Sequence, residues 1–183
     1  PMRSSAPPCC SSRGLARTCG TILLERLEIP TIIVMHVLLN HHYMVLVGLN
    51  DRASEWHDVY EIDIATGERR LIERNDQEIA SYLAGLDLKP RVALRTLPEG
   101  GEILRRAGDK WERILAYGQA DSLTTQPIEI EGDGKSALLL SSVGRDKAAV
   151  TRVRLADGAT SVVAESDKAD VQDLWLDPRT RTP

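Results

Sequence analysis

The segment VYEIDIATGERRLIER, at residues 59–74, returns as VTRVRLADGATSVVAE at residues 150–165. The two copies begin 91 residues apart (59 and 150) and align without a gap, so that Gly67 falls on Gly158. In each copy, alternating apolar residues precede a short loop that ends in glycine, and a second apolar run follows. Such a loop suits a turn closed by a left-handed residue, because glycine has no Cβ to clash there. Each copy is therefore predicted to be a β-hairpin.

The match continues upstream at the same offset. Residues 46–49 fall on 137–140, and residues 35–40 fall on 126–131. An offset of 91 residues (59 to 150) is about twice the length of a four-stranded propeller blade, roughly 40–50 residues. A looser copy lies between the two, and first strands are predicted to begin near residues 35, 79, 126 and 171. Short strands in groups of four at a steady spacing favour radial repetition over a sandwich.

The predicted fold is all-β, a partial β-propeller of about three four-stranded antiparallel blades plus the start of a fourth. Residues 29–183 form this propeller, while residues 1–28, rich in Ser, Pro and Arg, are expected to be a disordered or non-native leader. Residues 76–84 could instead form one or two helical turns. Because propellers typically have about 4–8 blades, the chain is expected to be a fragment or to pair with another chain. The expected blades are residues 35–73, 79–116 and 126–164, with the next beginning at 171–183.

The composition is that of a globular protein, with 42% hydrophobic and 27% charged residues and a net charge of −4. The Arg pairs 69–70 and 105–106 lie beside predicted strands, which indicates solvated strand faces and no nucleic-acid partner. No apolar run is long enough to span a bilayer, so no membrane partner is expected and a cytoplasmic location is predicted. The cysteines indicate neither a disulfide framework nor a zinc site. They are Cys9, Cys10 and Cys19.

Five segments share the character of one known family. They are VGLNDR (47–52), WHDVYEIDIATGER (56–69), GDGKSALLLSS (132–142), GRDKAAV (144–150) and DLWLDPRT (173–180). Together they resemble the propeller domain of prolyl oligopeptidase-like (S9 family) serine peptidases. The likeness is greatest to the dipeptidyl-aminopeptidase and acylaminoacyl-peptidase branch of that family.

This resemblance implies a propeller that caps an active site and restricts access to it. In the family, a separate α/β-hydrolase domain supplies the Ser-Asp-His triad. These 183 residues contain no Gly-x-Ser-x-Gly nucleophile elbow. No catalytic, cofactor-binding or metal-binding residue is therefore assigned, no cofactor is expected, and no activity is expected from this chain alone. The implied partners are the peptide substrate of the parent enzyme and the hydrolase domain, with self-association through exposed blade faces as a further interaction.

The histidines and the paired serines are the residues most able to carry chemistry, and no arrangement of them predicts a site. A metal centre needs further converging ligands, and the sequence places none beside His41 and His42. Ser141 and Ser142 end a predicted strand with no strand-to-helix elbow, so neither is predicted to be a nucleophile. The other two histidines are His36 and His57.

Loop acids and tryptophans are assigned structural roles. Asp51, Glu55 and Asp146 lie in predicted loops between second and third strands, where carboxylates cap turns. The three tryptophans fall in or beside predicted strands, and packing between blades is their expected role. They are Trp56, Trp111 and Trp175.

Two other functions remain open at this point. The first is a stand-alone or oligomerising propeller that acts as a binding module. The second is another propeller hydrolase, such as a metal-dependent lactonase, which needs acidic and amide side chains in a central channel. The predicted first strands offer only Asn40, Glu129 and Glu131 for that purpose, which disfavours a lactonase. Fold alone does not separate these functions, and the family resemblance favours the peptidase propeller.

Overall fold

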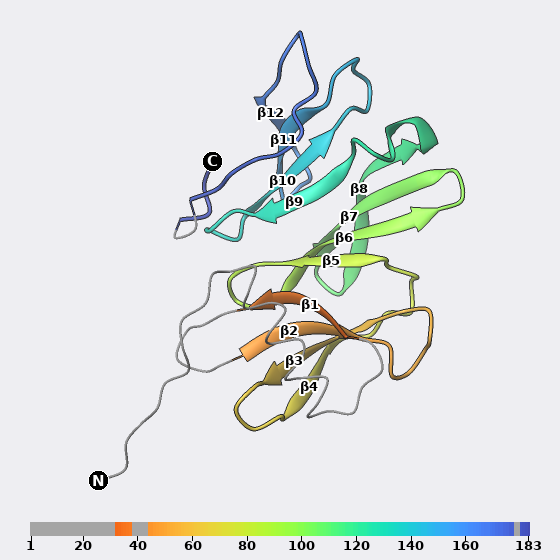
Figure 1. The fold of residues 1–183 in the computed structure, drawn as a ribbon, viewed down its shortest axis with the longest axis vertical. Coiled ribbons are helices and arrows are strands. Elements are labelled where there is room, and N and C mark those ends of the chain that lie inside the picture. Colours follow the sequence, from red (N-terminus) through yellow and green to blue (C-terminus); the bar gives the residue numbers. More distant parts are fainter. Residues whose placement is uncertain (1–31, 38–43, 178–179) are drawn as a thin grey trace.

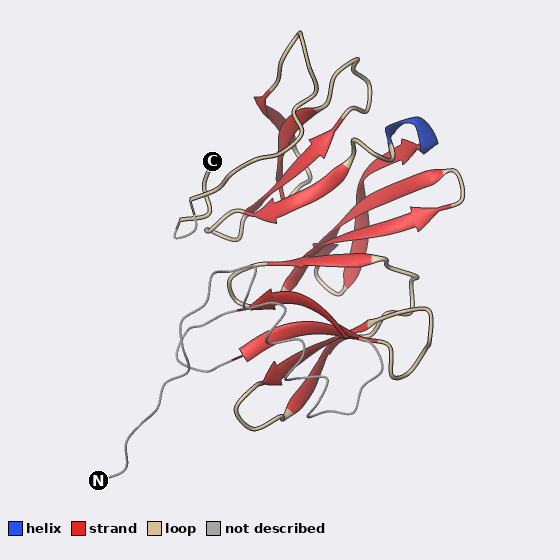
Figure 2. Cartoon of the chain, in the orientation of Figure 1, coloured by secondary structure: helices blue, strands red, loops and turns tan. Residues whose placement is uncertain are grey.

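The computed structural model describes residues 32–37, 44–177 and 180–183, with side chains from residue 44 onward. The expected leader, Asn40 and the adjacent histidines His41 and His42 lie outside these residues. Strands and turns dominate, and the helical structure in the described part is the short 3₁₀ turn η1 (Gln119–Asp121) (Figure 2). No helix in this part has the length and apolar character needed to cross a membrane.

The described residues form three four-stranded antiparallel sheets that follow one another along the chain (Figure 1). Neighbouring strands in each sheet are consecutive in sequence, which is the blade pattern of a propeller. The first strands of successive sheets contact one another, β1 with β5 and β5 with β9. The predicted all-β partial propeller is confirmed. Sheet 1 contains β1 (Ile32–Val37), β2 (Met44–Leu49), β3 (Asp58–Asp63) and β4 (Arg69–Glu73); sheet 2 contains β5 (Ser81–Ala84), β6 (Pro90–Leu97), β7 (Gly100–Ala107) and β8 (Lys110–Gly118); sheet 3 contains β9 (Gln126–Ile130), β10 (Ser136–Ser141), β11 (Ala149–Arg154) and β12 (Thr160–Ala164).

The outer hairpins of sheets 1 and 3 have the same register. The β3–β4 pairing has a bulge between Val59 and Tyr60, and the β11–β12 pairing has one between Val150 and Thr151, 91 residues later (59 to 150). The glycines that close the two turns have φ values of 79° and 75°, in the left-handed region where glycine avoids the Cβ clash. The repeat predicted from the sequence is therefore reproduced down to one backbone irregularity.

Upstream of these hairpins the ungapped alignment is wrong by one residue. β2 and β10 are equivalent at an offset of 92 residues (44 to 136), whereas β3 and β11 are equivalent at 91 (58 to 149). The loop 50–57 is one residue longer than the loop 142–148. The cores agree, because Leu46 and Leu138 lie in equivalent places beside the first residues of the outer hairpins. The sequence hides this insertion because the central residues of both strands, 45–47 and 137–140, are apolar and match at either offset.

Sheet 2 is the looser middle copy. The predicted strands at 92–96, 102–106 and 111–116 lie within β6, β7 and β8. Its first strand, β5, is shorter than the predicted 79–84, and the helical alternative for residues 76–84 is wrong. In sheet 1, β1 begins three residues before the predicted 35–40 (32 against 35).

Sheet 2 buries one face against sheet 1 and the other against sheet 3. Leu46 and Val59 of sheet 1 pack against Tyr82 and Leu104 of sheet 2. The opposite face of sheet 2 packs against sheet 3. This second core contains Val92, Ile103, Ile130, Ala137, Leu139, Val153 and Leu155. Aliphatic side chains supply nearly all of these contacts, as expected for a sequence without phenylalanine.

The far face of sheet 3 is covered by residues 171–176. Val171, Leu174 and Leu176 pack against Leu138, Leu140, Ala148 and Val150 of that sheet. The segment was expected to be a first strand, but it is not a strand in the structure, because no described residue pairs with it in a ladder.

A turn after this segment nevertheless copies the blade pattern. Asp177 donates its backbone N–H to Thr182 O at 3.0 Å, as Glu131 does to Ser136 O at 2.9 Å in sheet 3. The backbone of Gly132 lies so close to Thr180 that a Cβ there would be 2.1 Å from its carbonyl oxygen. The fourth unit is therefore positioned on sheet 3 by face packing and by this turn.

Candidate functional site

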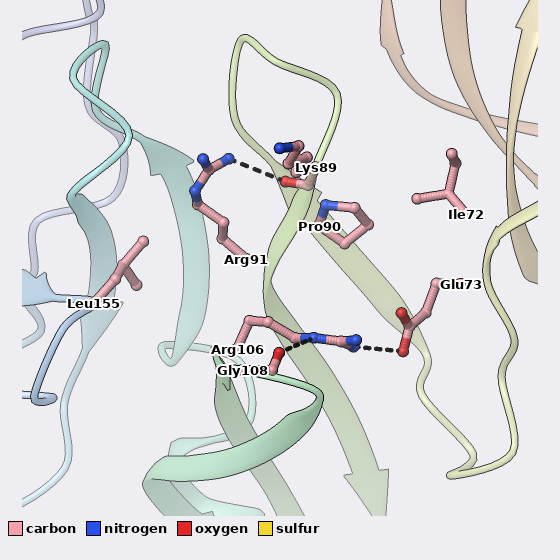
Figure 3. A pocket seen from close by; sticks show the side chains of 8 residues that line it. All are labelled: Ile72, Glu73, Lys89, Pro90, Arg91, Arg106, Gly108 and Leu155. Atoms are coloured by element: carbon pink, nitrogen blue, oxygen red, sulfur yellow. Dashed lines mark hydrogen bonds and ion pairs between the residues drawn. The ribbon is translucent and has the colours of Figure 1, made fainter.

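A cavity of about 380 Å³ lies where sheets 1 and 2 meet the β11–β12 turn of sheet 3 (Figure 3). Its wall comes from the end of β4, the start of β6, the end of β7 and the two turns after β7 and β11. Because three sheets contribute, no short sequence motif could have indicated it. The lining residues are Ile72, Glu73, Lys89, Pro90, Arg91, Arg106, Gly108 and Leu155.

An ion pair between sheets 1 and 2 forms one side of this cavity. Arg106 donates from Nη1 to Glu73 Oε1 at 2.7 Å and from Nε to the carbonyl of Gly108 at 2.8 Å. Trp111 donates from Nε1 to the same carboxylate oxygen at 3.0 Å, and the Arg106 guanidinium lies 5.1 Å from the Trp111 ring centre. Glu73 therefore accepts two donors from sheet 2, and the pair fixes one sheet against the other.

Arg91 forms the opposite side, where the β5–β6 turn ends. Its Nη2 donates to Asp87 Oδ2 at 2.9 Å, and its Nη1 donates to the carbonyl of Lys89 at 3.4 Å. Hydrogen bonding from the guanidinium lowers the pKa of Asp87, and the carboxylate in turn raises the pKa of Arg91. Gly134 of the β9–β10 turn faces this guanidinium, 3.6 Å from where its Cβ would lie. Arg91 thus lies against the β9–β10 turn of sheet 3 while its hydrogen bonds stay within the β5–β6 turn.

The cavity can bind and position a ligand, and its lining lacks the residues of a serine-peptidase triad. Ile72, Pro90 and Leu155 form apolar wall, and the remaining side chains are charged. The lining residues include no serine, cysteine or histidine, so neither a nucleophile nor a general base of the triad type is present. Among the described residues, no group of three or more His, Cys, Asp or Glu is placed to hold a metal ion.

A second polar cluster, which we call the Arg52 clasp, joins sheet 1 to the segment before β5. Arg52 donates from Nε and Nη2 to the two carboxylate oxygens of Asp58, both at 2.7 Å. Asp58 is buried, and it also accepts the backbone N–H of Asn75 at 2.8 Å. The Asn75 side chain exchanges two hydrogen bonds with Ile79, at 2.8 and 2.9 Å. Hydrogen bonding from Arg52 lowers the pKa of Asp58.

The histidines are not brought together with a serine. His36 lies on β1, and His57 lies in the loop before β3. The His57 Nε2 atom is buried and has no hydrogen-bond partner in the described part of the chain. Burial lowers the pKa of this imidazole.

Ser141 and Ser142 have structural partners. Ser142 donates from Oγ to Asp121 Oδ1 at 2.6 Å and lies 2.6 Å from Thr124 Oγ1. Ser141 accepts the backbone N–H of Val143 at 3.2 Å. Ser141 is the last residue of β10 and Ser142 follows it, and the one-residue correction makes Ser142 equivalent to position 50 of sheet 1. Ser142 therefore ties the η1 turn to the β10–β11 loop, and this geometry matches no nucleophile elbow.

The loop acids lie where the sequence predicts, between second and third strands. Asp51 accepts a hydrogen bond from Arg69 at 2.9 Å, and Asp146 pairs with Lys147 at 3.0 Å on the surface. Glu55 is exposed. Asp51 and Asp146 therefore form ion pairs with residues of their own sheet, and none of the three acids lines the cavity.

The glutamates of β9 and its turn are held by arginines. Glu131 accepts a two-point hydrogen bond from Arg152, with both distances at 2.8 Å, and Glu129 accepts one from Arg181 at 3.1 Å. Carboxylates neutralised in this way are poor ligands for a metal ion. The arrangement gives no support to the lactonase alternative.

The three tryptophans differ in their surroundings. Trp111 packs between sheets 1 and 2, with its ring centre 5.7 Å from that of Tyr82, as expected. Trp56 is half-buried in the loop before β3. The expectation is wrong for Trp175, whose side chain is 84% exposed. Trp175 alternates with Leu174 and Leu176, which face sheet 3, so its own side chain lies on the opposite face of the segment.

The fold defines the class as a β-propeller, and sequence comparison defines its family. No family model matches the chain. The chain is 41% identical over 142 residues to dipeptidyl aminopeptidase BIII of Pseudoxanthomonas mexicana, which covers 76% of this chain and 21% of that protein. A solved structure from a study of two prolyl endopeptidases is also similar. The alignment covers 74% of this chain and 22% of the other chain, with a TM-score of 0.43 and 15% sequence identity.

The chain is a propeller portion belonging to the S9, or prolyl oligopeptidase, family of peptidases. It spans about a fifth of the length of the dipeptidyl aminopeptidase that it matches. Sequence reasoning found the family and the blade repeat. It missed the cavity between the sheets and the Arg52 clasp, because side chains from separate units meet there.

Proposed function

We propose that the chain is a non-catalytic segment of an S9-type serine peptidase that caps a hydrolase domain and restricts which peptides reach it. The observation that carries this proposal is the 41% identity to a dipeptidyl aminopeptidase over 142 residues. Its partners would be an α/β-hydrolase domain outside these 183 residues and the peptide substrate of the complete enzyme.

The packing of the sheets supports a capping role. Apolar cores join successive units. Charged pairs add to this packing: Glu73–Arg106 links sheets 1 and 2, and Asp58–Arg52 holds the loop before β3. A wall built in this way is stiff, because close-packed interiors and bidentate ion pairs resist small displacements. Such a wall is suited to excluding large substrates from a neighbouring active site.

A fluorophosphonate probe tests the non-catalytic part of the proposal, since it labels activated serines covalently. We expect no labelling of the purified chain and stoichiometric labelling of a longer protein that includes a hydrolase domain. Labelling of the chain itself, removed by one Ser→Ala change, would show that a catalytic serine lies within it.

The gating part requires that longer protein. Arg106→Gln removes the ion pair between sheets 1 and 2, while Arg113→Gln removes a pair with Glu102 inside sheet 2. We expect Arg106→Gln to raise kcat/KM for long peptides relative to a dipeptide substrate, and Arg113→Gln to leave that ratio unchanged. An unchanged ratio in both variants would contradict gating at this junction.

A further inference from the structure

Sheets 1 and 3 carry equivalent surface cavities with opposite charge. The cavity on sheet 3 has a volume of about 350 Å³, and the cavity on sheet 1 has a volume of about 220 Å³. Every lining position in one corresponds to a lining position in the other, at the offsets of 92 and 91 residues that relate the strands. The sheet 3 cavity is lined by Ser136, Arg152, Arg154, Ala159, Thr160 and Ser161; the sheet 1 cavity is lined by Met44, Glu61, Asp63, Glu68, Arg69 and Arg70.

The cavity is a property of the repeated unit. The lining side chains of Met44, Glu61 and Asp63 lie on the face of the sheet that packs against the following unit, and Met44 itself contacts the core between sheets 1 and 2. The cavity on sheet 1 is present although sheet 2 covers the rest of that face. The corresponding cavity on sheet 3 is therefore not a consequence of the smaller segment that covers its face.

The charge difference arises at five positions. Where sheet 1 has Glu61, Asp63 and Glu68, sheet 3 has two arginines and an alanine, and where sheet 1 has two arginines, sheet 3 has Thr160 and Ser161. No carboxylate lines the sheet 3 cavity, whereas the sheet 1 cavity has three together with two arginines. Equivalent backbones thus present guanidinium groups on one sheet and mostly carboxylates on the other.

The two arginines of the sheet 3 cavity are oriented by carboxylates that lie outside its lining. Arg152 uses Nε and Nη2 to bind Glu131, both at 2.8 Å. Arg154 uses Nε at 2.9 Å and Nη2 at 2.7 Å to bind Asp157. Nη1 of each guanidinium has no partner among the described residues, so two charged donors remain for a ligand.

Two hydroxyl groups complete the set of donors. The side chains of Ser136 and Ser161 form no hydrogen bond with any described residue. Ser161 pairs across the ladder with Arg152, and Ser136 pairs with Arg154, so hydroxyl and guanidinium groups alternate over adjacent strands. This is a combination of charged forks and neutral donors that suits an oxyanion with several acceptor oxygens.

We propose that the sheet 3 cavity binds a phosphate group, with Arg152 and Arg154 as the charged donors and the hydroxyls of Ser136 and Ser161 as neutral donors. Phosphate presents more acceptor oxygens than a carboxylate, so it can accept from both Nη1 groups and the hydroxyls together. The group can come from inorganic phosphate or from a phosphoserine in a peptide, which share this chemistry. The site does not depend on the peptidase role of the complete protein.

Calorimetric titration of the full chain at low ionic strength tests the site, with inorganic phosphate, a phosphoserine peptide and the unphosphorylated peptide as probes. We expect both phosphate probes to bind and the unphosphorylated peptide not to bind. A phosphopeptide that binds at least tenfold tighter than inorganic phosphate assigns the group to a peptide, and equal affinities assign it to the free anion. Both results support the site, and absence of binding by both phosphate probes overturns it.

Arg154→Gln is the decisive variant, because this side chain is exposed and its loss leaves no buried charge. We expect it to weaken phosphate binding about tenfold, the usual effect of losing one charge-assisted hydrogen bond. Arg70→Gln is the matched control, since it makes the same charge change in the equivalent cavity on sheet 1. Equal weakening by both variants would show non-specific charge attraction and would overturn the proposal, as would wild-type binding by Arg154→Gln.

Discussion

Sheets 1 and 3 share the register of their outer hairpins, yet they hold the following unit in different ways. In sheet 1, the buried Asp58 joins Arg52 to Asn75, and Asn75 then binds Ile79. In sheet 3, alanine replaces the aspartate, at position 149. The next segment is held there by Asp170, which accepts the backbone N–H of Ala148 at 2.7 Å, and by Val171, which donates to the carbonyl of Ala148 at 2.9 Å.

This difference separates two levels of information in the repeat. The apolar alternation and the turn glycine determine the strands and their bulge, so they recur in both units. The polar attachments depend on single residues in loops of different length, and they vary from unit to unit. The two attachments use equivalent carbonyl groups, those of His57 and Ala148. Asn75 donates from Nδ2 to His57 O at 3.3 Å in sheet 1, and Val171 donates its backbone N–H to Ala148 O in sheet 3.

The largest difference between the two units should appear in their cores. Leu46 and Leu138 are equivalent and fully buried, but Leu46 packs against a complete sheet and Leu138 against residues 171–176. Leu46→Ala should cost about 4 kcal/mol and Leu138→Ala about 2 kcal/mol, because the smaller segment can move into the space left behind. Urea denaturation gives both values. A larger cost for Leu138→Ala would contradict this comparison.

The attachments should differ next. Asp58→Ala removes the centre of the Arg52 clasp and leaves the Asn75 amide without its partner, which should cost about 3 kcal/mol. Asp170→Ala removes one exposed acceptor and should cost about 1 kcal/mol. The same denaturation experiment compares the two. Equal costs would mean that the clasp adds nothing beyond a single hydrogen bond.

The turns should behave alike. Gly67→Ala and Gly158→Ala each place a Cβ on a residue with φ near +75°, so each should cost about 1–2 kcal/mol. Gly118→Ala is the control, because Gly118 lies in β8 without a positive φ and its nearest neighbour would be 4.0 Å from the new Cβ. A difference above about 1 kcal/mol between the two turn variants would show that the hairpins are not equivalent.

The smallest effect concerns His57, where sheet 3 has Ala148. Burial lowers the pKa of His57 in the folded chain below its ordinary value of 6.5, so the unfolded chain takes up the proton first as the pH falls. Wild-type stability should therefore decline more than that of His57→Ala as the pH decreases below about 6.5. Denaturation midpoints at pH 7.5 and 5.5 measure this difference, and the other histidines cancel because both proteins contain them. Parallel declines would rule out the effect.

The sequence predicted the elements whose cause is local or periodic. Gly67 and Gly158 revealed the hairpins, and the spacing of the apolar runs revealed three sheets. The insertion in the loop 50–57 escaped detection because the centres of both strands, residues 45–47 and 137–140, are apolar and fit at two offsets. The segment 171–176 has the composition of a strand, but a strand also needs a hydrogen-bonded neighbour, and no described residue pairs with this segment in a ladder.

The functional features were less accessible. The pairing of Glu73 with Arg106 joins residues 33 positions apart, and nothing in their local sequence indicates it. The opposite charges of the two surface cavities were visible in the aligned repeat, in which Glu61 and Asp63 align with Arg152 and Arg154. Their meaning emerged only when the structure showed that these positions line a cavity.

The segment 171–176 has a consequence for how such a chain forms during synthesis. It rests on sheet 3 through Val171, Leu174 and Leu176 without a ladder partner. The face of sheet 3 is thus covered by the residues that follow it directly in the chain, as sheet 2 covers sheet 1 and sheet 3 covers sheet 2. Assembly in this order follows the direction of translation and relies on contacts close in sequence, which favours rapid folding. Each newly formed apolar face is then covered soon after it appears.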